Sequence, residues 1–356
     1  MRILIAGICG FVGSTLAKSW LISEPSLTIY GLDNFIRPGS ENNRIDLQKL
    51  GVKFFHGDIR SASDFETLPQ VDWVIDAAAN PSVLAGVNDL TSSRQLVEHN
   101  LQGTVNILEY CRRHGAGFIM LSTSRVYAIT PLIKVAVEPV GIAFHLSEGQ
   151  LFPPGLSSAG VSEEFSTVPP ISLYGSTKLA SEILALEYGE TFGFPVWINR
   201  CGVMAGAGQF GRADQGIFAF WINSWLHRRA LTYIGYGGKG YQVRDCLHPR
   251  DLIPLLRKQT SPGTTSLVRL VNIGGGRSHA ISLAELSGWC ANRFGPHTVT
   301  GNLAIRRFDI PWLIMDTAKA REVWDWQPQT PLNDILEEIA LHAEQHPHWL
   351  ELSEIP

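Results

Sequence analysis

The sequence predicts an α/β fold with a doubly wound parallel sheet, joined to a smaller mixed α/β part. Short apolar runs rich in β-branched residues alternate with helical stretches through the first 200 residues, and a glycine-rich turn follows the first run. The predicted strands are residues 3–6, 27–32, 53–55, 73–76, 118–121 and 196–199. Ligands of such sheets bind beyond the carboxyl ends of the strands, so the residues that follow each strand are the functional candidates.

Composition narrows the class of protein. The 356 residues are 45% hydrophobic, which is ample for a full core, and the length predicts about two domains. The net charge of −4, without a block of Lys and Arg, argues against a nucleic-acid partner. Five scattered cysteines without a CxxC pair indicate reduced thiols, and no apolar run reaches the roughly 18 residues of a membrane span. We therefore expect a cytoplasmic protein with no membrane partner.

The first strand leads into the glycine-rich turn GICGFVGS, residues 7–14, and then into a helix that runs to about residue 22. The run 3–6 is too short for a signal peptide, which makes a buried strand the better interpretation. Glycines in this context permit a tight turn and let backbone N–H groups approach a pyrophosphate at the helix N-terminus. The alternative is an ordinary tight turn between a strand and a helix.

An acidic residue ends the second strand. Asp33 lies 20 residues after Gly13, where a dinucleotide site places its partner for the adenosine ribose. A carboxylate there accepts from the 2′-hydroxyl and repels a 2′-phosphate, which favours NAD over NADP, although the nearby Arg37 weakens that preference. The alternative is that Asp33 only opens a turn with Asn34.

Small and polar residues follow the next strands. Residues 57–59 (Gly-Asp-Ile) come after the third strand, and residues 77–79 (Ala-Ala-Ala) after the fourth, where small side chains let a ligand lie against the strand ends. A helical region at about 91–114 leads to the fifth strand, which ends near Thr123. The hydroxyl of Thr123 can hydrogen-bond a substrate hydroxyl, or it merely terminates the strand.

Residues 171–182 (ISLYGSTKLASE) hold Tyr174 and Lys178 four residues apart. On a helix these two side chains share one face. The charge of the lysine is then expected to lower the pKa of the Tyr174 phenol from about 10 towards neutral pH, which would make it a general acid/base for an alcohol that loses hydride. The alternative is a chance pair on a surface helix.

The second half of the chain alternates less regularly. Residues 128–170 are rich in Pro and Gly and predict a long loop that is functional or mobile. Helices are expected near 217–228, 283–294 and 332–346, and strands near 233 and 268–273. We expect an NAD-binding domain over 1–200 with a return segment at about 243–275, and a substrate domain made of 201–242 and 276–356.

The order of these elements resembles the extended short-chain dehydrogenase/reductase family over almost the whole chain. The motifs that carry the resemblance are GICGFVGS, Asp33, Asp58, Ala77–Ala79, STSRVY (122–127), YGSTK (174–178), VRDCLHPRDL (243–252), NIGGG (272–276), and Asp316 with WQP (326–328). The resemblance implies a Rossmann-like NAD-binding domain, a catalytic set of Thr123, Tyr174 and Lys178, and a C-terminal part that binds a nucleotide sugar. Ile8 departs from the family pattern, which commonly has glycine there.

The resemblance also implies two sets of binding residues. The cofactor set is Gly7, Gly10, Phe11, Val12, Asp33, Asn34, Arg37, Asp58, Ile59, Ala77, Ala78, Ala79, Asn100, Tyr174 and Lys178. The substrate set is Ser124, Arg125, Asn199, Gln209, Arg244 and Arg306, in which Arg244 and Arg306 match family positions that contact the diphosphate. We expect His248 to be structural and His342, His346 and His348 to lie at a solvated helix end, so no metal site is predicted.

Three stretches look most like the CDP-paratose (CDP-tyvelose) 2-epimerases of this family: 33–40 with Asn43, 208–216 with its QF and DQG, and 242–245. Two features depart from them. Ser124-Arg125 replaces the usual Asn-Lys, and the 128–170 segment is longer and contains an unfamiliar FPPGL at 152–156. The related 4,6-dehydratases carry Asp-Glu after the catalytic threonine as an acid/base pair, which Ser124-Arg125 cannot supply.

The resemblance therefore implies a homodimeric or homotetrameric epimerase that oxidises and re-reduces a nucleotide-diphosphate sugar with tightly bound NAD. A CDP-sugar inverted at C2 is the first interpretation. A 4-epimerase of a UDP-, GDP- or dTDP-sugar, or a nucleotide-sugar reductase, is the nearest alternative. A non-catalytic NAD-sensing protein is a remote one, because such proteins usually lose the tyrosine or the lysine.

Overall fold

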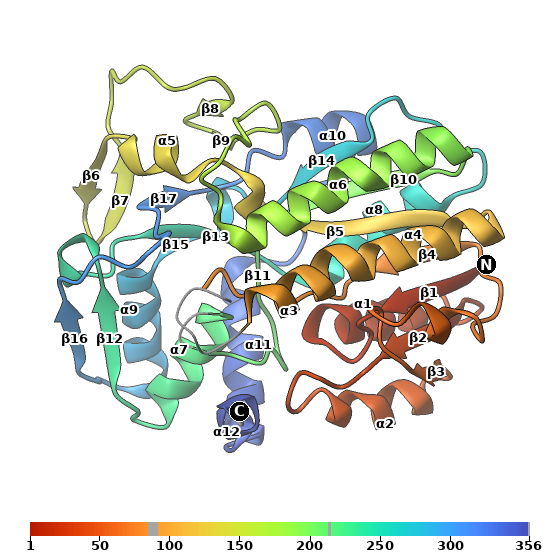
Figure 1. The fold of residues 1–356 in the computed structure, drawn as a ribbon. Coiled ribbons are helices and arrows are strands. Elements are labelled where there is room, and N and C mark those ends of the chain that lie inside the picture. Colours follow the sequence, from red (N-terminus) through yellow and green to blue (C-terminus); the bar gives the residue numbers. More distant parts are fainter. Residues whose placement is uncertain (85–91, 213–214, 355–356) are drawn as a thin grey trace.

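The chain is built around one parallel sheet that helices cover on both faces (Figure 1). The computed structural model describes residues 1–84, 92–212 and 215–354. Seven strands pair in the order β14-β10-β5-β4-β1-β2-β3, all parallel. They are β1 (Arg2–Ala6), β2 (Thr28–Asp33), β3 (Lys53–His56), β4 (Trp73–Asp76), β5 (Gly117–Thr123), β10 (Val196–Cys201) and β14 (Leu270–Ile273). The predicted fold class and all of the strands predicted for this sheet are confirmed.

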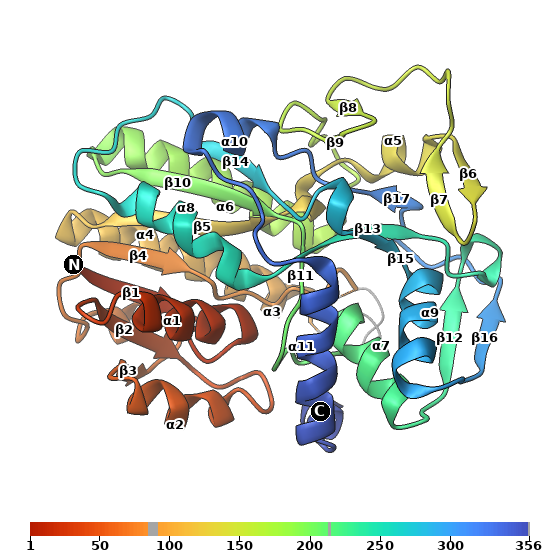
Figure 2. The same cartoon turned by 180° about the vertical axis from the view of Figure 1, so that it is seen from behind.

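Two helical layers enclose the sheet. One layer holds α1 (Phe11–Ser23), α2 (Glu41–Lys49), α8 (Ile253–Thr260) and α10 (Ala318–Trp324), and Figure 2 shows α1 and α8 in front of the strands. The other layer holds α4 (Gly103–His114) and the long α6 (Ser172–Phe192), which lie in front in Figure 1. This arrangement places the N-termini of α1 and α6 at the carboxyl edge of the sheet.

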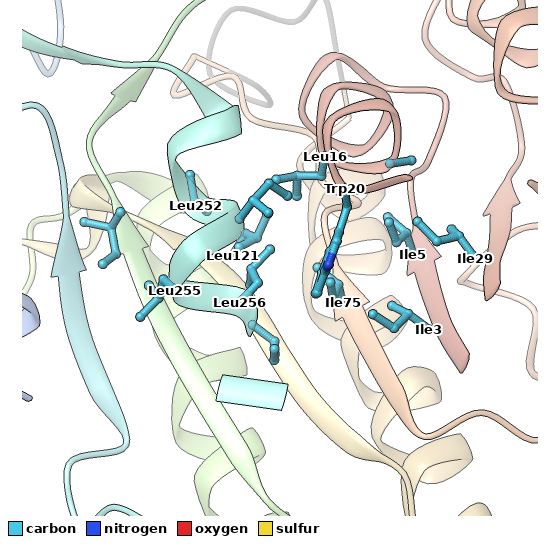
Figure 3. Close-up of a cluster of buried hydrophobic side chains, with 14 of the residues drawn as sticks. Ile3, Ile5, Leu16, Trp20, Ile29, Ile75, Leu121, Leu252, Leu255 and Leu256 are labelled. Atoms are coloured by element: carbon cyan, nitrogen blue, oxygen red, sulfur yellow. The ribbon is translucent and has the colours of Figure 1, made fainter. Parts of the chain in front are cut away.

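The larger core lies between the sheet and the α1/α8 layer. In Figure 3, Trp20 of α1 lies against Ile75 and beside Ile5 of the sheet, and Leu16 points towards Leu121 of β5. The side chains of Leu255 and Leu256 on α8 close the layer beside them. Trp20 is fully buried. Burial of a side chain of this size contributes roughly 1.5–3 kcal/mol, so this contact fixes α1 and the glycine turn ahead of it.

The helix predicted over 91–114 is three consecutive helical pieces. A short α3 (Ser93–Val97) leads into a π-helical turn, Glu98–Gln102, and then into α4. The predicted start at Thr91 lies outside the described residues. The π turn makes the backbone bulge, and such bulges occur frequently at functional sites.

The prediction of one long loop over 128–170 is wrong. The segment contains α5 (Ile129–Lys134), a hairpin of β6 (Val137–Val140) and β7 (Ala143–Leu146), and a smaller one of β8 (Leu156–Ser157) and β9 (Gly160–Val161). Its apolar side chains form a core with residues 310–315. Strands of two to four residues are too short to leave a readable alternation in the sequence.

The remaining residues form a smaller mixed α/β part. Its strands are β11 (Val203–Met204), β13 (Val243–Leu247), β15 (Ala280–Ser282) and β17 (Trp312–Leu313) in one sheet, with β12 (Leu231–Ile234) and β16 (Val299–Asn302) as a separate pair. Its helices are α7 (Ile217–Leu226), α9 (Leu283–Phe294), α11 (Leu332–Gln345) and α12 (Trp349–Glu354). Within the expected return segment, α8 and β14 join the large sheet, whereas β13 pairs inside the smaller part.

All five cysteines are buried and unpaired, as expected for reduced thiols. In the part of the chain that the structure describes, no helix has both the length and the apolar surface of a membrane-crossing segment.

Candidate active site

The three predicted catalytic residues meet where β5 ends against the first turns of α6. Thr123 is the last residue of β5, and Tyr174 and Lys178 lie one turn apart on α6. All three are buried. Gly175 allows this close approach, because a Cβ at this position would lie 2.2 Å from the carbonyl oxygen of Arg125. The turn after the strand therefore packs directly against the helix beside Tyr174.

The protonation of Tyr174 differs from the sequence prediction. Burial raises the pKa of Tyr174 to about 12, whereas a hydrogen bond with Thr123 and the charge of Arg125 act in the opposite direction. The expected lowering by Lys178 is thus not what the structure shows, because desolvation of the phenolate outweighs the neighbouring cations. Without a bound cofactor, Tyr174 is therefore a phenol.

Lys178 lies beside a carboxyl group that the sequence analysis missed. Burial raises the pKa of Asp76, the last residue of β4, and the charge of Lys178 opposes that shift. Thr104 Oγ1 donates to Asp76 Oδ2 at 3.0 Å. A charged residue at the end of an otherwise apolar strand was the available signal for Asp76. When ionised, this carboxyl balances part of the charge of the ammonium group of Lys178.

Asn100 connects the end of β4 to α6. Asn80 N donates to Asn100 Oδ1 at 2.8 Å, and Asn100 Nδ2 donates to Asn80 O and to Thr177 Oγ1. Ser181 Oγ on α6 donates to the carbonyl of Asn100 at 2.9 Å. Because its amide is already engaged within the protein, Asn100 holds α6 in place next to the strand ends.

The glycine turn fits a pyrophosphate. A Cβ at Gly7 would lie 2.8 Å from the Cα of Ala78, so the turn and the end of β4 approach as closely as backbones can. Gly10 is the N-cap of α1 and supplies no side-chain cap, so the first N–H groups of the helix, at Phe11 and Val12, face outward. Ile8 fits in place of the usual glycine because its side chain is buried against Gly31 of β2.

The carboxyl ends of β2 and β3 present two acids side by side. Asp33 accepts from Cys9 N and from Phe35 N, both at 2.8 Å, and burial raises its pKa. Asn34 Nδ2 donates to Asp58 Oδ2 at 2.9 Å. These side chains, with Ile59 buried behind them, can hold the adenosine part of a dinucleotide.

Arg37 points away from this ribose position, towards a segment far along the chain. Its guanidinium donates to the carbonyl of Phe210 at 2.6 Å and to Gln215 Oε1 at 3.0 Å. Gly39 packs against the ring of Phe210, where a Cβ would lie 2.9 Å from a ring carbon. Two of the stretches singled out in the sequence are thus in contact; Asp214, from the second of them, lies outside the described residues.

A group of arginines lies beyond the catalytic residues. Arg244 on β13 pairs with Asp309 at 3.2 Å, and Arg125 Nη1 reaches the carbonyl of Phe308 at 3.5 Å. Burial, together with the charges of Arg244 and Arg306, lowers the pKa of Arg125 to about 10. Asp309 was not among the predicted site residues, although an acid three residues after Arg306 was a usable signal.

The remaining predicted substrate residues lie in different environments. Asn199 is fully buried and exchanges two hydrogen bonds with Gln259, at 3.0 and 2.9 Å, so neither polar atom of its amide faces the site. Ser124 is buried in the turn after Thr123. The side-chain amide of Gln209 donates to the carbonyl of Met204 at 2.8 Å. The backbone carbonyl of Gln209 accepts from Trp349 Nε1.

The histidines considered in the sequence, His248, His342 and His346, are not part of the catalytic set. His248 Nδ1 accepts from Arg250 N, and burial lowers its pKa to about 4, as fits a structural residue. His342 and His346 stack with ring centroids 4.2 Å apart beside a hollow of about 720 Å³ between α1, α2 and α11. Within the described residues, no group of three or more His, Cys, Asp or Glu side chains could hold a metal ion.

Comparison with known families decides the assignment. The model of the "NAD dependent epimerase/dehydratase family" matches residues 3–258. The chain belongs to this family. NAD is accordingly the cofactor of this epimerase/dehydratase, in agreement with the uncapped α1 and the acid at the end of β2.

Three relatives of this epimerase/dehydratase illustrate the range of the family. The CDP-paratose 2-epimerase of Salmonella typhi is 29% identical over 350 residues, which cover 94% of this chain and 96% of that protein. The dTDP-glucose 4,6-dehydratase of Streptomyces antibioticus is 28% identical over 351 residues, covering 96% and 90%. A point variant of the UDP-glucuronic acid 4-epimerase of Bacillus cereus, solved with NAD and a fluorinated UDP-glucuronic acid, has a TM-score of 0.75 at 25% identity, covering 97% and 99%.

Proposed function

We propose that the chain is an NAD-dependent epimerase of a nucleotide-diphosphate sugar, and that it inverts C2 of a CDP-sugar. The observation that carries the proposal is the position of Arg125. The backbone of Arg125 packs against Gly175 beside Tyr174. Its side chain reaches Phe308, in the same segment as Arg306. A general acid/base and a cluster of guanidinium groups thus flank one site, as a sugar diphosphate requires.

The mechanism uses three side chains. Tyr174 takes the proton of a ring hydroxyl and later returns one, with Thr123 orienting that hydroxyl and Lys178 one turn further along the same helix. NAD held by the glycine turn and by Asp33 would supply a hydride acceptor and donor for the ring carbon, and its positive charge would favour the Tyr174 phenolate. Because hydride goes out and comes back, the reaction needs no external reductant.

The turn after Thr123 disfavours dehydration. Loss of water from a keto sugar needs an acid and a base beside the ring, and Ser124 and Arg125 supply no carboxyl group there. Of the relatives compared above, the Salmonella typhi protein is a 2-epimerase and the Streptomyces antibioticus protein a dehydratase. The chemistry of the turn supports epimerisation.

The choice of a CDP-sugar rests on the contact between Arg37 and the segment that contains Phe210 and Gln215. Both partners belong to the stretches that resemble CDP-paratose 2-epimerases, and they lie 173 residues apart in the chain. The contact holds the NAD-binding edge of the large sheet against the smaller part. We propose that this junction shapes the nucleotide site.

We also propose self-association into a dimer or tetramer through the helices that flank the catalytic residues. Large apolar side chains are exposed on these helices: Val97 on α3, and Leu173, Ile183 and Phe192 on α6. Covering such side chains in a symmetric interface would bury them without obstructing Tyr174.

The direct test is proton NMR of purified protein with CDP-, UDP-, GDP- and dTDP-sugars and no added NAD. We expect inversion at C2 of a CDP-sugar, sustained by cofactor that remains bound through purification. Inversion at C4 of another nucleotide sugar would keep the mechanism and reassign the substrate. Consumption of added NAD(P)H would instead identify a reductase. Absence both of turnover and of bound NAD would contradict the proposal.

A further inference from the structure

Arg125 lies between two parts of the site, Tyr174 on α6 and the group of arginines near Phe308. Its backbone oxygen is the atom closest to a Cβ at Gly175, so the residue is pressed against α6 beside Tyr174. Its side chain extends to Phe308, next to Asp309 and two residues from Arg306. One half-buried guanidinium group therefore lies in the electrostatic field of both the phenol and the other arginines.

The positive charges around Arg125 favour the binding of an anionic ligand. Arg125, Arg244 and Arg306 act on one another as like charges, and Asp309 is the carboxylate that acts on Arg125. Asp309 is engaged by Arg244 and by Gln242 Nε2 at 3.0 Å. Within the described residues, the only side-chain hydrogen bond of Arg125 goes to the carbonyl of Phe308. A half-buried guanidinium group with so weak a partner gains most from a bound anionic ligand.

We propose that Arg125 binds the β-phosphate of the substrate and thereby determines which ring carbon reaches Tyr174. The proposal rests on the proposed function, since it assumes a nucleotide-diphosphate sugar. Because the backbone of Arg125 lies against the helix that carries Tyr174, one arginine side chain spans the distance from the phenol to the bound phosphate, which places the reacting hydroxyl close to the phosphate. Only C1 and one oxygen separate C2 from the β-phosphorus, whereas C4 lies across the ring. The position of Arg125 accordingly favours inversion at C2.

The β-phosphate contact is tested by titration calorimetry of the protein with its bound NAD. The affinities of CDP, UDP, GDP and dTDP are compared with those of the corresponding nucleoside monophosphates. The diphosphate that binds most tightly, and its monophosphate, are then measured with Arg125→Met, Arg125→Lys and Arg113→Met. Arg113 is exposed on α4 and serves as the matched control. We expect Arg125→Met to weaken the diphosphate about 10- to 100-fold and the monophosphate hardly at all, with Arg125→Lys in between. Arg113→Met should bind like the wild type.

Three results would overturn this contact. The first is an unchanged affinity of Arg125→Met for the diphosphate, and the second is an equal loss of affinity for the monophosphate and the diphosphate. The third is a loss of affinity seen only with ligands that carry a sugar, which would place Arg125 on the sugar instead. Thermal unfolding and retained NAD identify any variant that has merely failed to fold, and the milder Arg125→Lys then carries the test. Absence of nucleotide binding by the wild type would overturn the inference together with the proposed function.

The positional part of the inference needs a separate readout. Borodeuteride added during turnover reduces any keto sugar in the site and marks the oxidised carbon with deuterium. Deuterium at C2 supports the role of Arg125 in selecting that carbon. Deuterium at C4, combined with a loss of diphosphate affinity in Arg125→Met, would retain the phosphate contact and overturn the selection of C2, while the epimerase function itself would stand.

Discussion

Replacing Tyr174 with Phe is expected to lower turnover about 10²- to 10⁴-fold, the usual contribution of a general acid/base, while NAD stays bound. The phenyl ring keeps the packing of Tyr174 against Leu96 and removes only the hydroxyl that hydrogen-bonds Thr123. Turnover is followed by proton NMR, and bound NAD is measured by absorbance after denaturation.

Tyr188 provides the matched control for this substitution. It lies on the same helix, α6, but its hydroxyl donates to Glu109 at 2.7 Å, away from Thr123. Tyr188→Phe should therefore keep nearly full turnover. If Tyr174→Phe were as active as Tyr188→Phe, Tyr174 would not be the acid/base.

Replacing Glu182 with Ala should destabilise the fold by about 3–5 kcal/mol, because it leaves a buried arginine without its carboxylate. Glu182 lies one turn after Lys178 and pairs with Arg200 at 2.7 Å, with side-chain exposures of 2% and 7%. Ser122 Oγ also donates to this carboxylate, and Arg200 Nη1 donates to Tyr127 Oη at 3.3 Å. The pair thus joins α6, β5 and β10 directly beneath the catalytic residues.

Urea unfolding measures this change in the free energy of unfolding. An exposed pair supplies the control: Lys49 lies 3.6 Å from Asp46, and both side chains are more than half exposed. Lys49→Ala should change the free energy of unfolding by less than about 1 kcal/mol. A loss of similar size in Glu182→Ala would show that the buried pair is not what anchors α6.

The sequence predicted the parts of the molecule that depend on local pattern. The glycine turn, Asp33 at the end of β2, and the spacing of Tyr174 and Lys178 are each readable within a few residues. Their placement at one edge of the sheet then follows from the rule that parallel strands end on the same side.

The features that the sequence analysis missed depend on contacts between distant residues. The amide of Asn199 is satisfied by Gln259, 60 residues away, and Arg37 is held by Phe210, 173 residues away. The pKa of Tyr174 is raised rather than lowered, because its burial depends on packing that neither residue of the Tyr-Lys pair reveals. The short strands of 128–170 form because residues 310–315 complete their core.

The central claim is that one hydrogen leaves the substrate as hydride and returns to the same carbon. It is tested most directly with the CDP-sugar that the NMR panel identifies, prepared with deuterium at C2 and supplied without NAD. Mass spectrometry and NMR of the product then locate the label. The mechanism predicts an inverted product that keeps deuterium at C2. Loss of the label to water would show that the carbon is deprotonated instead, and would contradict the hydride mechanism.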